Sequence, residues 1–261
     1  MTTKPGCKIN LGLHVVGRRP DGYHDLQTIF LPVSQLHDEL TITPLPDSEP
    51  ATLTQDGLEL DNAPADNICL RAYHLLQAEF SLPPVSITLH KHIPFGAGLG
   101  GGSSDAAATL GMLNTMFSLG LDATALEQRA AHLGADCAFF VRNQPAYATG
   151  IGDRLEPLPE LSTLGNQYSI QIAIPDGEHV STREAYSGLD HSLFGTERPD
   201  LRLAVRQPVA EWRKLIANDF ERSVFRTHPA IAELKADMYR RGALYASMTG
   251  SGAAVFGLFP R

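Results

Sequence analysis

The first half of the chain alternates hydrophobic and polar residues over several short stretches, a pattern typical of β-strands. Residues 7–16 (CKINLGLHVV) and 23–33 (YHDLQTIFLPV) flank the turn-like sequence GRRPDG, so we expect a long hairpin. Residues 38–45 and 51–60 are expected to add strands to the same sheet. A further strand is expected at residues 85–91 (VSITLHK), which lead almost directly into a glycine-rich segment.

Three stretches in the middle of the chain carry the spacing and end signals of α-helices. They cover residues 67–80, 103–120 and 122–134, and the second follows the glycine-rich segment at once. The residues expected to cap or stop these helices are Asp66 or Asn67 for the first, Ser103 or Ser104 with Gly120 for the second, and Asp122 or Thr124 with Gly134 for the third.

The second half of the chain predicts further strands and helices. A strand is expected at residues 169–175, helices at 181–189 and 228–241, and a strand, glycine turn and second strand at 244–259. These patterns are typical of an α+β fold with mixed or antiparallel sheets.

The composition of the chain shifts between residues 150 and 164. We place there a boundary between two lobes, an N-terminal one of residues 1–150 and a C-terminal one of residues 151–261, and expect the functional site in the cleft between them.

The charge of the chain narrows its partners. With 21 basic and 29 acidic residues the formal net charge is −8, which argues against a nucleic-acid or anionic-membrane partner, since both need a basic face. Residues 4–19 nevertheless hold basic residues and no acidic one. That local charge suits a small anionic ligand, although a solvated basic end would look the same.

The three cysteines, Cys7, Cys69 and Cys137, form no CxxC pair and indicate reduced thiols, not disulfides or a zinc site. The N-terminus has no signal-peptide layout, and no apolar run approaches the roughly 18 residues needed to span a bilayer. We therefore expect a cytoplasmic protein without a membrane partner.

The segment PFGAGLGGGSSDAA, residues 94–107, packs five glycines into seven positions. Successive backbone N–H groups of such a run can converge on an anion, and the helix that follows adds a partly positive N-terminus. Gly96, Gly98 and Gly101 formally fit a dinucleotide fingerprint, but repeated βαβ units are missing around them, and no Gly-Lys-Ser/Thr is present. The segment thus predicts phosphate binding, with a flexible or tight-packing loop that holds no ligand as the alternative.

The segment IPFGAGLGGGSSDAAA resembles the phosphate loop of the GHMP kinases, and SMTGSGAAVFGLF resembles their third, glycine-rich motif. CKINLGLHVVGRRPDGYHDLQTIF and LGADCAFFV resemble one branch of that family, which phosphorylates the 2-hydroxyl of a cytidine-diphosphate sugar alcohol in the non-mevalonate isoprenoid pathway. The resemblance spans the whole chain and implies ATP with Mg²⁺. The residues it places along the ATP phosphates are Pro94, Phe95, Gly96, Ala97, Gly98, Leu99, Gly100, Gly101, Gly102, Ser103 and Ser104.

The same resemblance implies two catalytic residues. Asp136 matches the family's catalytic base, and Lys8 matches the lysine that contacts this aspartate and the reacting hydroxyl. A nearby ammonium would keep the carboxylate ionised. Taken alone, Asp136 would be read as a helix-terminal turn residue and Lys8 as a surface charge.

Substrate recognition is implied for Asn10, Tyr23, His24 and Tyr186. Tyr23 would stack on the cytosine, His24 would meet the base edge, and Asn10, on the same strand face as Lys8, would meet the sugar-alcohol hydroxyls. Without the resemblance, residues 21–24 would be only a hairpin turn. Tyr186 is expected to be either the second aromatic wall or a core residue.

Two departures from the family pattern stand out. Cys7 replaces a common alanine beside Lys8, and Asp105 follows the serine pair where many members have an uncharged residue. Because a carboxylate repels phosphates, Asp105 is expected to face away from them or to reach Mg²⁺. The other Mg²⁺ ligands, the adenine contacts and the oligomeric state are left open.

Three rival functions share parts of this pattern. A homoserine-type GHMP kinase would not need an aromatic base pocket, and a non-catalytic nucleotide-binding protein of the same fold would not need Lys8 and Asp136. An NAD-dependent redox enzyme is the weakest rival, since only the glycine spacing and the position of Asp122 favour it.

Overall fold

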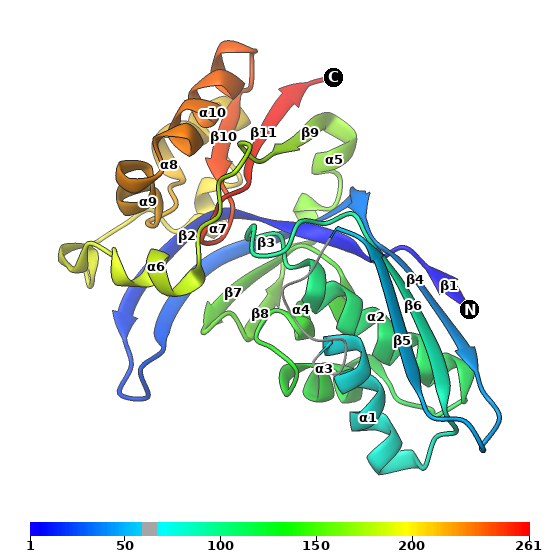
Figure 1. Cartoon of the computed structure of the whole chain (residues 1–261). Helices are drawn as coiled ribbons and strands as arrows, with labels where there is room; N and C mark the ends of the chain where they lie inside the picture. The colour runs from blue at the N-terminus through cyan, green and yellow to red at the C-terminus, as the bar shows by residue number, and fades with distance from the viewer. Residues whose placement is uncertain (59–66) are drawn as a thin grey trace. The chain divides into compact units, whose positions relative to one another are not determined.

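The structure is a computed structural model that describes residues 1–58 and 67–261 (Figure 1). Helices combine with mixed sheets, so the predicted α+β class is confirmed. The chain forms two compact units, and each is described in turn. Unit 1 comprises residues 1–7, 32–95 and 100–143, and unit 2 comprises residues 8–31, 96–99 and 144–261.

The lobes of residues 1–150 and 151–261 stay a prediction. The two compact units do not follow that division, since each is assembled from three segments of the chain. Residues 8–31 and 96–99 belong with the C-terminal part of the chain. Strand pairing explains the first of these segments, since residues 26–30 pair antiparallel with residues 146–150.

The sheet of unit 1 has the strand order β1 (Thr2–Thr3), β4 (Glu39–Pro44), β6 (Val85–Lys91), β5 (Thr52–Gly57). β4 pairs with β6 antiparallel, whereas β5 pairs with β6 in parallel. The prediction that residues 38–45 and 51–60 extend the sheet of the first hairpin is wrong. They join residues 85–91 in a sheet of their own, because a crossover connection places β5 parallel to β6. Residues 59 and 60 of the predicted strand lie outside the described residues.

The helices of unit 1 are α1 (Ile68–Phe80), α2 (Gly101–Met116), α3 (Ala123–Ala131) and α4 (Cys137–Arg142). α1 and α2 lie side by side next to the strands β4, β5 and β6 (Figure 1). Their apolar faces and the inward side chains of the sheet form one core, which includes the buried residues Leu40, Ile42, Tyr73, Leu76, Ile87, Leu110 and Leu113.

The predicted helix starts are confirmed for α1 and α3. The side chain of Asn67 accepts from the N–H of Cys69, and that of Asp122 accepts from Ala125. Asp66, the alternative cap of α1, lies outside the described residues. α3 ends at Ala131, three residues before the predicted stop.

The predicted caps of α2 are wrong. The helix begins at Gly101, and its N-cap is Gly100 in the left-handed conformation, so Ser103 and Ser104 lie within the first turn. It ends at Met116, before Gly120. The loop reaches the helix through glycines with positive φ, and one of these glycines is the N-cap. The preference of serine for cap positions therefore misplaces the helix start.

Two sheets contribute to unit 2. One has the order β2 (Gly6–Arg18), β3 (His24–His37), β7 (Ala146–Gly150), β8 (Arg154–Pro157), which confirms the predicted pairing of the first two strands. The other is antiparallel, with the order β10 (Tyr245–Met248), β11 (Val255–Pro260), β9 (Tyr168–Ala173).

Short helices connect and cover these strands. α10 (Pro229–Arg240) packs on β10 and β11, and α9 (Glu221–Thr227) packs against α10 (Figure 1). The remaining ones are η2 (Pro159–Leu161), α5 (Leu164–Gln167), α6 (Thr182–Ser187), η3 (His191–Leu193), α7 (Leu201–Ala204), η4 (Val209–Glu211) and α8 (Trp212–Leu215).

The core of unit 2 gathers residues far apart in sequence, among them Leu13, Val15, Val180, Phe220, Ile231, Met238 and Val255. No helix among the described residues is long and apolar enough to cross a membrane. The three cysteines are buried and form no disulfide.

Candidate active site

The glycine-rich loop is shaped by backbone conformations that favour glycine. Gly96, Gly98 and Gly100 have φ values of +66°, +76° and +73°. Gly98 also lies directly against the third glycine motif, since a Cβ added there would be 2.1 Å from the carbonyl oxygen of Thr249. A side chain at residue 98 would therefore displace one of the two segments that meet here.

The helix after the loop starts with donors that no side chain caps. Gly100, the N-cap of α2, has no side chain, and the first intrahelical hydrogen bond runs from Ser104 N–H to Gly100 O at 3.0 Å. The N–H groups of the three residues before Ser104 have no acceptor within the helix. This end of a 16-residue helix therefore suits an anion.

Lys8 is buried in unit 2, with 4% of its surface exposed. Its ammonium donates to Asn10 Oδ1 at 2.7 Å and to the carbonyl oxygen of Gly98 at 3.0 Å. The ammonium also lies 5.1 Å from the centre of the Phe30 ring. A buried cation needs such partners, and here one of them is the glycine loop itself.

Thr249 completes this network from the third glycine motif. Its hydroxyl lies 3.2 Å from Gly98 O and 3.1 Å from Asn10 Oδ1, and it accepts from the N–H of Asn10 at 3.0 Å. The Asn10 side-chain amide donates to Thr28 Oγ1 at 2.9 Å, and Thr28 donates to Gly12 O. The predicted common face of Lys8 and Asn10 is confirmed, and the network fixes both side chains beside the loop.

Asp136 lies at the start of α4 in unit 1, half-buried, in a right-handed helical conformation. Its side chain does not cap α4. Lys8 belongs to unit 2, so the pairing of the two residues stays a prediction.

His24 and Tyr186, predicted for base binding, lie together in unit 2. Their rings are stacked with centroids 4.8 Å apart, and Phe194 lies edge-on to His24 at 6.2 Å. Burial lowers the pKa of His24 and the Arg18 cation lowers it further, so the imidazole is neutral near pH 7. Tyr23 is 63% exposed on the adjoining turn.

The helix that carries Tyr186 is held in place by a histidine. His228 Nδ1 lies 2.5 Å from Glu178 and Nε2 lies 3.0 Å from Glu184, the latter on α6. The hydrogen bond to Glu184 raises the pKa of His228, and Glu178 raises it further against the effect of burial. The protonated ring therefore ties α6 to the junction between α9 and α10.

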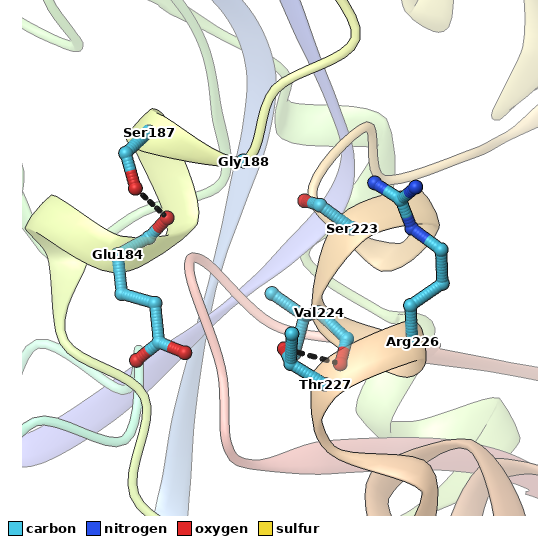
Figure 2. Close-up of a pocket in the computed structure, with 7 residues that line it drawn as sticks. All are labelled: Glu184, Ser187, Gly188, Ser223, Val224, Arg226 and Thr227. Carbon is cyan, nitrogen blue, oxygen red and sulfur yellow. Dashed lines mark hydrogen bonds between the residues drawn. The ribbon is translucent and has the colours of Figure 1, made fainter.

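A cavity opens between α6 and α9 beside this histidine (Figure 2). Glu184 and Ser187 line it from α6, while α9 faces them across the opening in Figure 2. The α9 residues at its wall are Ser223, Val224, Arg226 and Thr227. The cavity lies next to α6, the helix of Tyr186.

Asp105 lies in the second turn of α2 and is 1% exposed, paired with Lys91. Its expected position relative to the phosphates or Mg²⁺ stays a prediction. Among the described residues no group of three or more His, Cys, Asp or Glu side chains is arranged to hold a metal ion.

Several residues of these networks were not singled out from the sequence. Thr249 lies inside the third glycine motif and Thr28 inside the opening one, so the motifs marked their segments but not the hydroxyls. Asp38, a buried acceptor of the Lys91 ammonium, was missed together with Lys91. No local sequence pattern marks this ion pair, because the two residues are 53 positions apart and meet only in the fold.

Comparisons with known proteins identify relatives of this chain. The family model "GHMP kinases N terminal domain" matches residues 67–144, and the family model "GHMP kinases C terminal" matches residues 201–261. A 4-diphosphocytidyl-2-C-methyl-D-erythritol kinase of Bacteroides thetaiotaomicron is 50% identical, over 99% of this chain and 92% of that protein. One of Porphyromonas gingivalis is 46% identical over 99% and 92%.

Among solved structures, a 4-(cytidine 5'-diphospho)-2C-methyl-D-erythritol kinase has a TM-score of 0.79 at 34% identity, over 99% of this chain and 90% of that one. A mevalonate kinase has a TM-score of 0.73 at 14% identity, over 99% and 91%, which shows a common fold.

The His228 bridge predicts a pH dependence of stability. Because the pKa of His228 is raised above its usual 6.5, its contribution is complete below that pH and is lost as the pH rises through the folded-state pKa. In thermal unfolding, His228→Gln should be less stable than the wild type at about pH 6, and the two proteins should have nearly equal stability at about pH 9. His132→Gln, the same change at an exposed histidine, is the control for the substitution itself. A deficit of His228→Gln that stays constant over this range would contradict the bridge.

Proposed function

Because the chain belongs to the GHMP kinase family, as the matching domains and the relatives at up to 50% identity show, we propose that it transfers the γ-phosphoryl group of ATP to the 2-hydroxyl of 4-diphosphocytidyl-2-C-methyl-D-erythritol. The observation that carries this proposal is the buried network of Lys8, Asn10 and Thr249 on the carbonyl of Gly98. It joins the family's opening, glycine-loop and third motifs at one point.

The triphosphate would lie along residues 94–104. The loop fits such a group, since glycines with positive φ leave its backbone bare and the N-terminus of α2 carries uncapped donors. Mg²⁺ bound with ATP supplies charge neutralisation during transfer. The hydroxyl of Ser103, in the first turn of α2, would add a donor to a phosphate oxygen.

Asp136 would accept the proton of the acceptor hydroxyl as its oxygen attacks the γ-phosphorus. A carboxylate is too weak a base to remove that proton beforehand, so the transfer accompanies bond formation. Lys8 would orient the hydroxyl and Asp136, and it is already held rigid by Asn10 and Gly98. Rigid placement lowers the entropic cost of reaching the transition state.

The cytosine would bind at the aromatic group of His24 and Tyr186, with the exposed Tyr23 closing over it. A neutral His24 can both donate and accept a hydrogen bond, which suits the polar edge of a base. The Asn10 amide donates one hydrogen to Thr28, and we assign its second hydrogen to a sugar-alcohol hydroxyl. With small-molecule substrates and reduced thiols, the reaction would take place in the cytoplasm.

The acceptor is tested by measuring ADP release with the cytidylated substrate, homoserine and mevalonate in parallel. We expect turnover only with the cytidylated substrate, because the other two present no base to the aromatic group. Comparable turnover with homoserine would favour the rival kinase. No ADP release above the enzyme-free background with any acceptor would favour the non-catalytic alternative.

The Asp136→Asn variant should lower kcat by about 10²–10⁴-fold, the usual effect of losing a positioned base, and should leave ATP affinity nearly unchanged. Asp122→Asn is a matched control, since it makes the same change at the start of α3, where asparagine also caps well. Near-normal turnover of Asp136→Asn would remove this residue from the mechanism.

The Tyr23→Ala variant should raise KM for the cytidylated substrate by about tenfold, because stacking a base on an aromatic ring contributes about 1–3 kcal/mol. KM for ATP should stay the same. Tyr23→Phe keeps the ring and should behave like the wild type in steady-state kinetics. Equal increases in both KM values for Tyr23→Ala would show that the base binds elsewhere.

A further inference from the structure

Three charged side chains are buried together in unit 1. Asp38, Lys91 and Asp105 are 0%, 3% and 1% exposed, respectively. They come from the segment between β3 and β4, the end of β6 and the second turn of α2. The proposed reaction uses none of them. Burying such charges costs free energy unless each one is paired and hydrogen-bonded in good geometry.

Asp38 holds the chain where the glycine loop begins. Its Oδ1 accepts from the N–H of His92 at 2.6 Å and from the N–H of Ile93 at 2.8 Å, the two residues before Pro94. Its Oδ2 accepts from the Lys91 ammonium. One carboxylate thus fixes the direction in which the chain leaves β6.

Lys91 holds the chain where the loop ends. Its ammonium donates to Asp105 Oδ2 at 2.7 Å, which ties β6 to the second turn of α2. A Cβ added to Gly101, the first residue of α2, would lie 2.8 Å from Ile93 Cγ2 and 3.4 Å from the Lys91 ammonium. The two ends of the loop are therefore packed against each other around one ammonium.

The charges in this group do not balance, since two carboxylates surround one ammonium. Burial raises the pKa of Asp105 to about 7, against the Lys91 cation, while the Asp38 carboxylate raises it further. Burial alone would lower the pKa of Lys91, but the two carboxylates outweigh it and raise it. Asp105 Oδ1 is buried without a hydrogen bond among the described residues. The Cys69 thiol of α1 also interacts with Asp105, and its pKa is raised by burial and by the Asp105 carboxylate.

We propose that the Asp38–Lys91–Asp105 triad is a positioning device for the phosphate-binding loop, which sets both loop ends so that the backbone donors converge on the triphosphate. The assignment rests on the proposed function. As the pH rises through about 7, Asp105 loses its proton and adds a second negative charge near the start of α2. ATP affinity should fall over that range, because this charge opposes the anion at the same helix end.

The test compares Asp105→Ala, which removes the anchor, with Asp105→Asn, which keeps an oxygen for Lys91 but has no charge to gain. Leu113→Ala is the matched control, since Leu113 is a fully buried residue of the same helix and lies about 12 Å along the helix axis from Asp105. For each protein we would measure KM for ATP, KM for the cytidylated substrate, the pH profile of both, thermal stability, and amide hydrogen exchange over residues 90–105.

Asp105→Ala should raise KM for ATP about tenfold, equivalent to about 1.4 kcal/mol, and leave KM for the acceptor unchanged. Its amides at His92 and Ile93 should exchange faster. Asp105→Asn should match the wild type at low pH and lack the rise of KM for ATP above neutrality. Leu113→Ala should lose thermal stability without any change in KM.

A purely structural triad predicts the opposite result, in which Asp105→Ala and Leu113→Ala change KM for ATP equally at equal loss of stability. If Asp105→Ala does not fold, a pH profile of Asp105→Asn identical to that of the wild type would overturn the proposal. Absence of ADP release by the wild type would instead refute the proposed function. Hydrogen exchange over residues 90–105, measured with and without ATP and Mg²⁺, tests the positioning role independently of turnover. Asp105→Ala should lose ATP-dependent protection that Leu113→Ala keeps, and equal protection in both variants would overturn the role.

Discussion

The carbonyl oxygen of Gly98 is the point on which unit 2 of this protein depends. It accepts from the Lys8 ammonium and lies within hydrogen-bond distance of the Thr249 hydroxyl, while the same Lys8 and Thr249 also bind Asn10. This contact requires a backbone with positive φ and no side chain, because any Cβ at residue 98 would collide with Thr249. The strand with Lys8, the glycine loop and the terminal motif therefore hold one another in place.

In unit 1, buried charged side chains fix the chain on both sides of the same loop. The glycine-rich loop, held at Gly98 by Lys8 and Thr249, is also fixed at its two ends. Asp38 binds the backbone before the loop, and Lys91 binds Asp105 after it. Lys8 in unit 2 and Lys91 in unit 1 are both buried beside the loop or its flanks. Oxygen acceptors satisfy both ammonium groups, as burial of a charge requires.

Much of the fold could be predicted from periodicity and end signals, as α1, α3 and the pairing of β2 with β3 show. Local patterns failed where a tertiary partner decided the outcome. The strands at residues 38–45 and 51–60 were assigned to the wrong sheet, because alternation identifies a strand but not its neighbour. The start of α2 was placed at serines, although the glycines before them continue to the helix.

The sequence by itself determined the family. It also predicted anion binding at residues 94–104 and the candidate residues Lys8, Asn10, His24 and Asp136, because each lies within a short motif. Only the tertiary structure decided that Thr249 joins Lys8 at Gly98, that Tyr186 stacks on His24, and that Asp105 turns inward to Lys91. The physical reason is that hydrogen bonds and ion pairs depend on positions a few ångströms apart in space. Their partners here are separated by up to 239 residues in the chain, a distance over which no local pattern carries information.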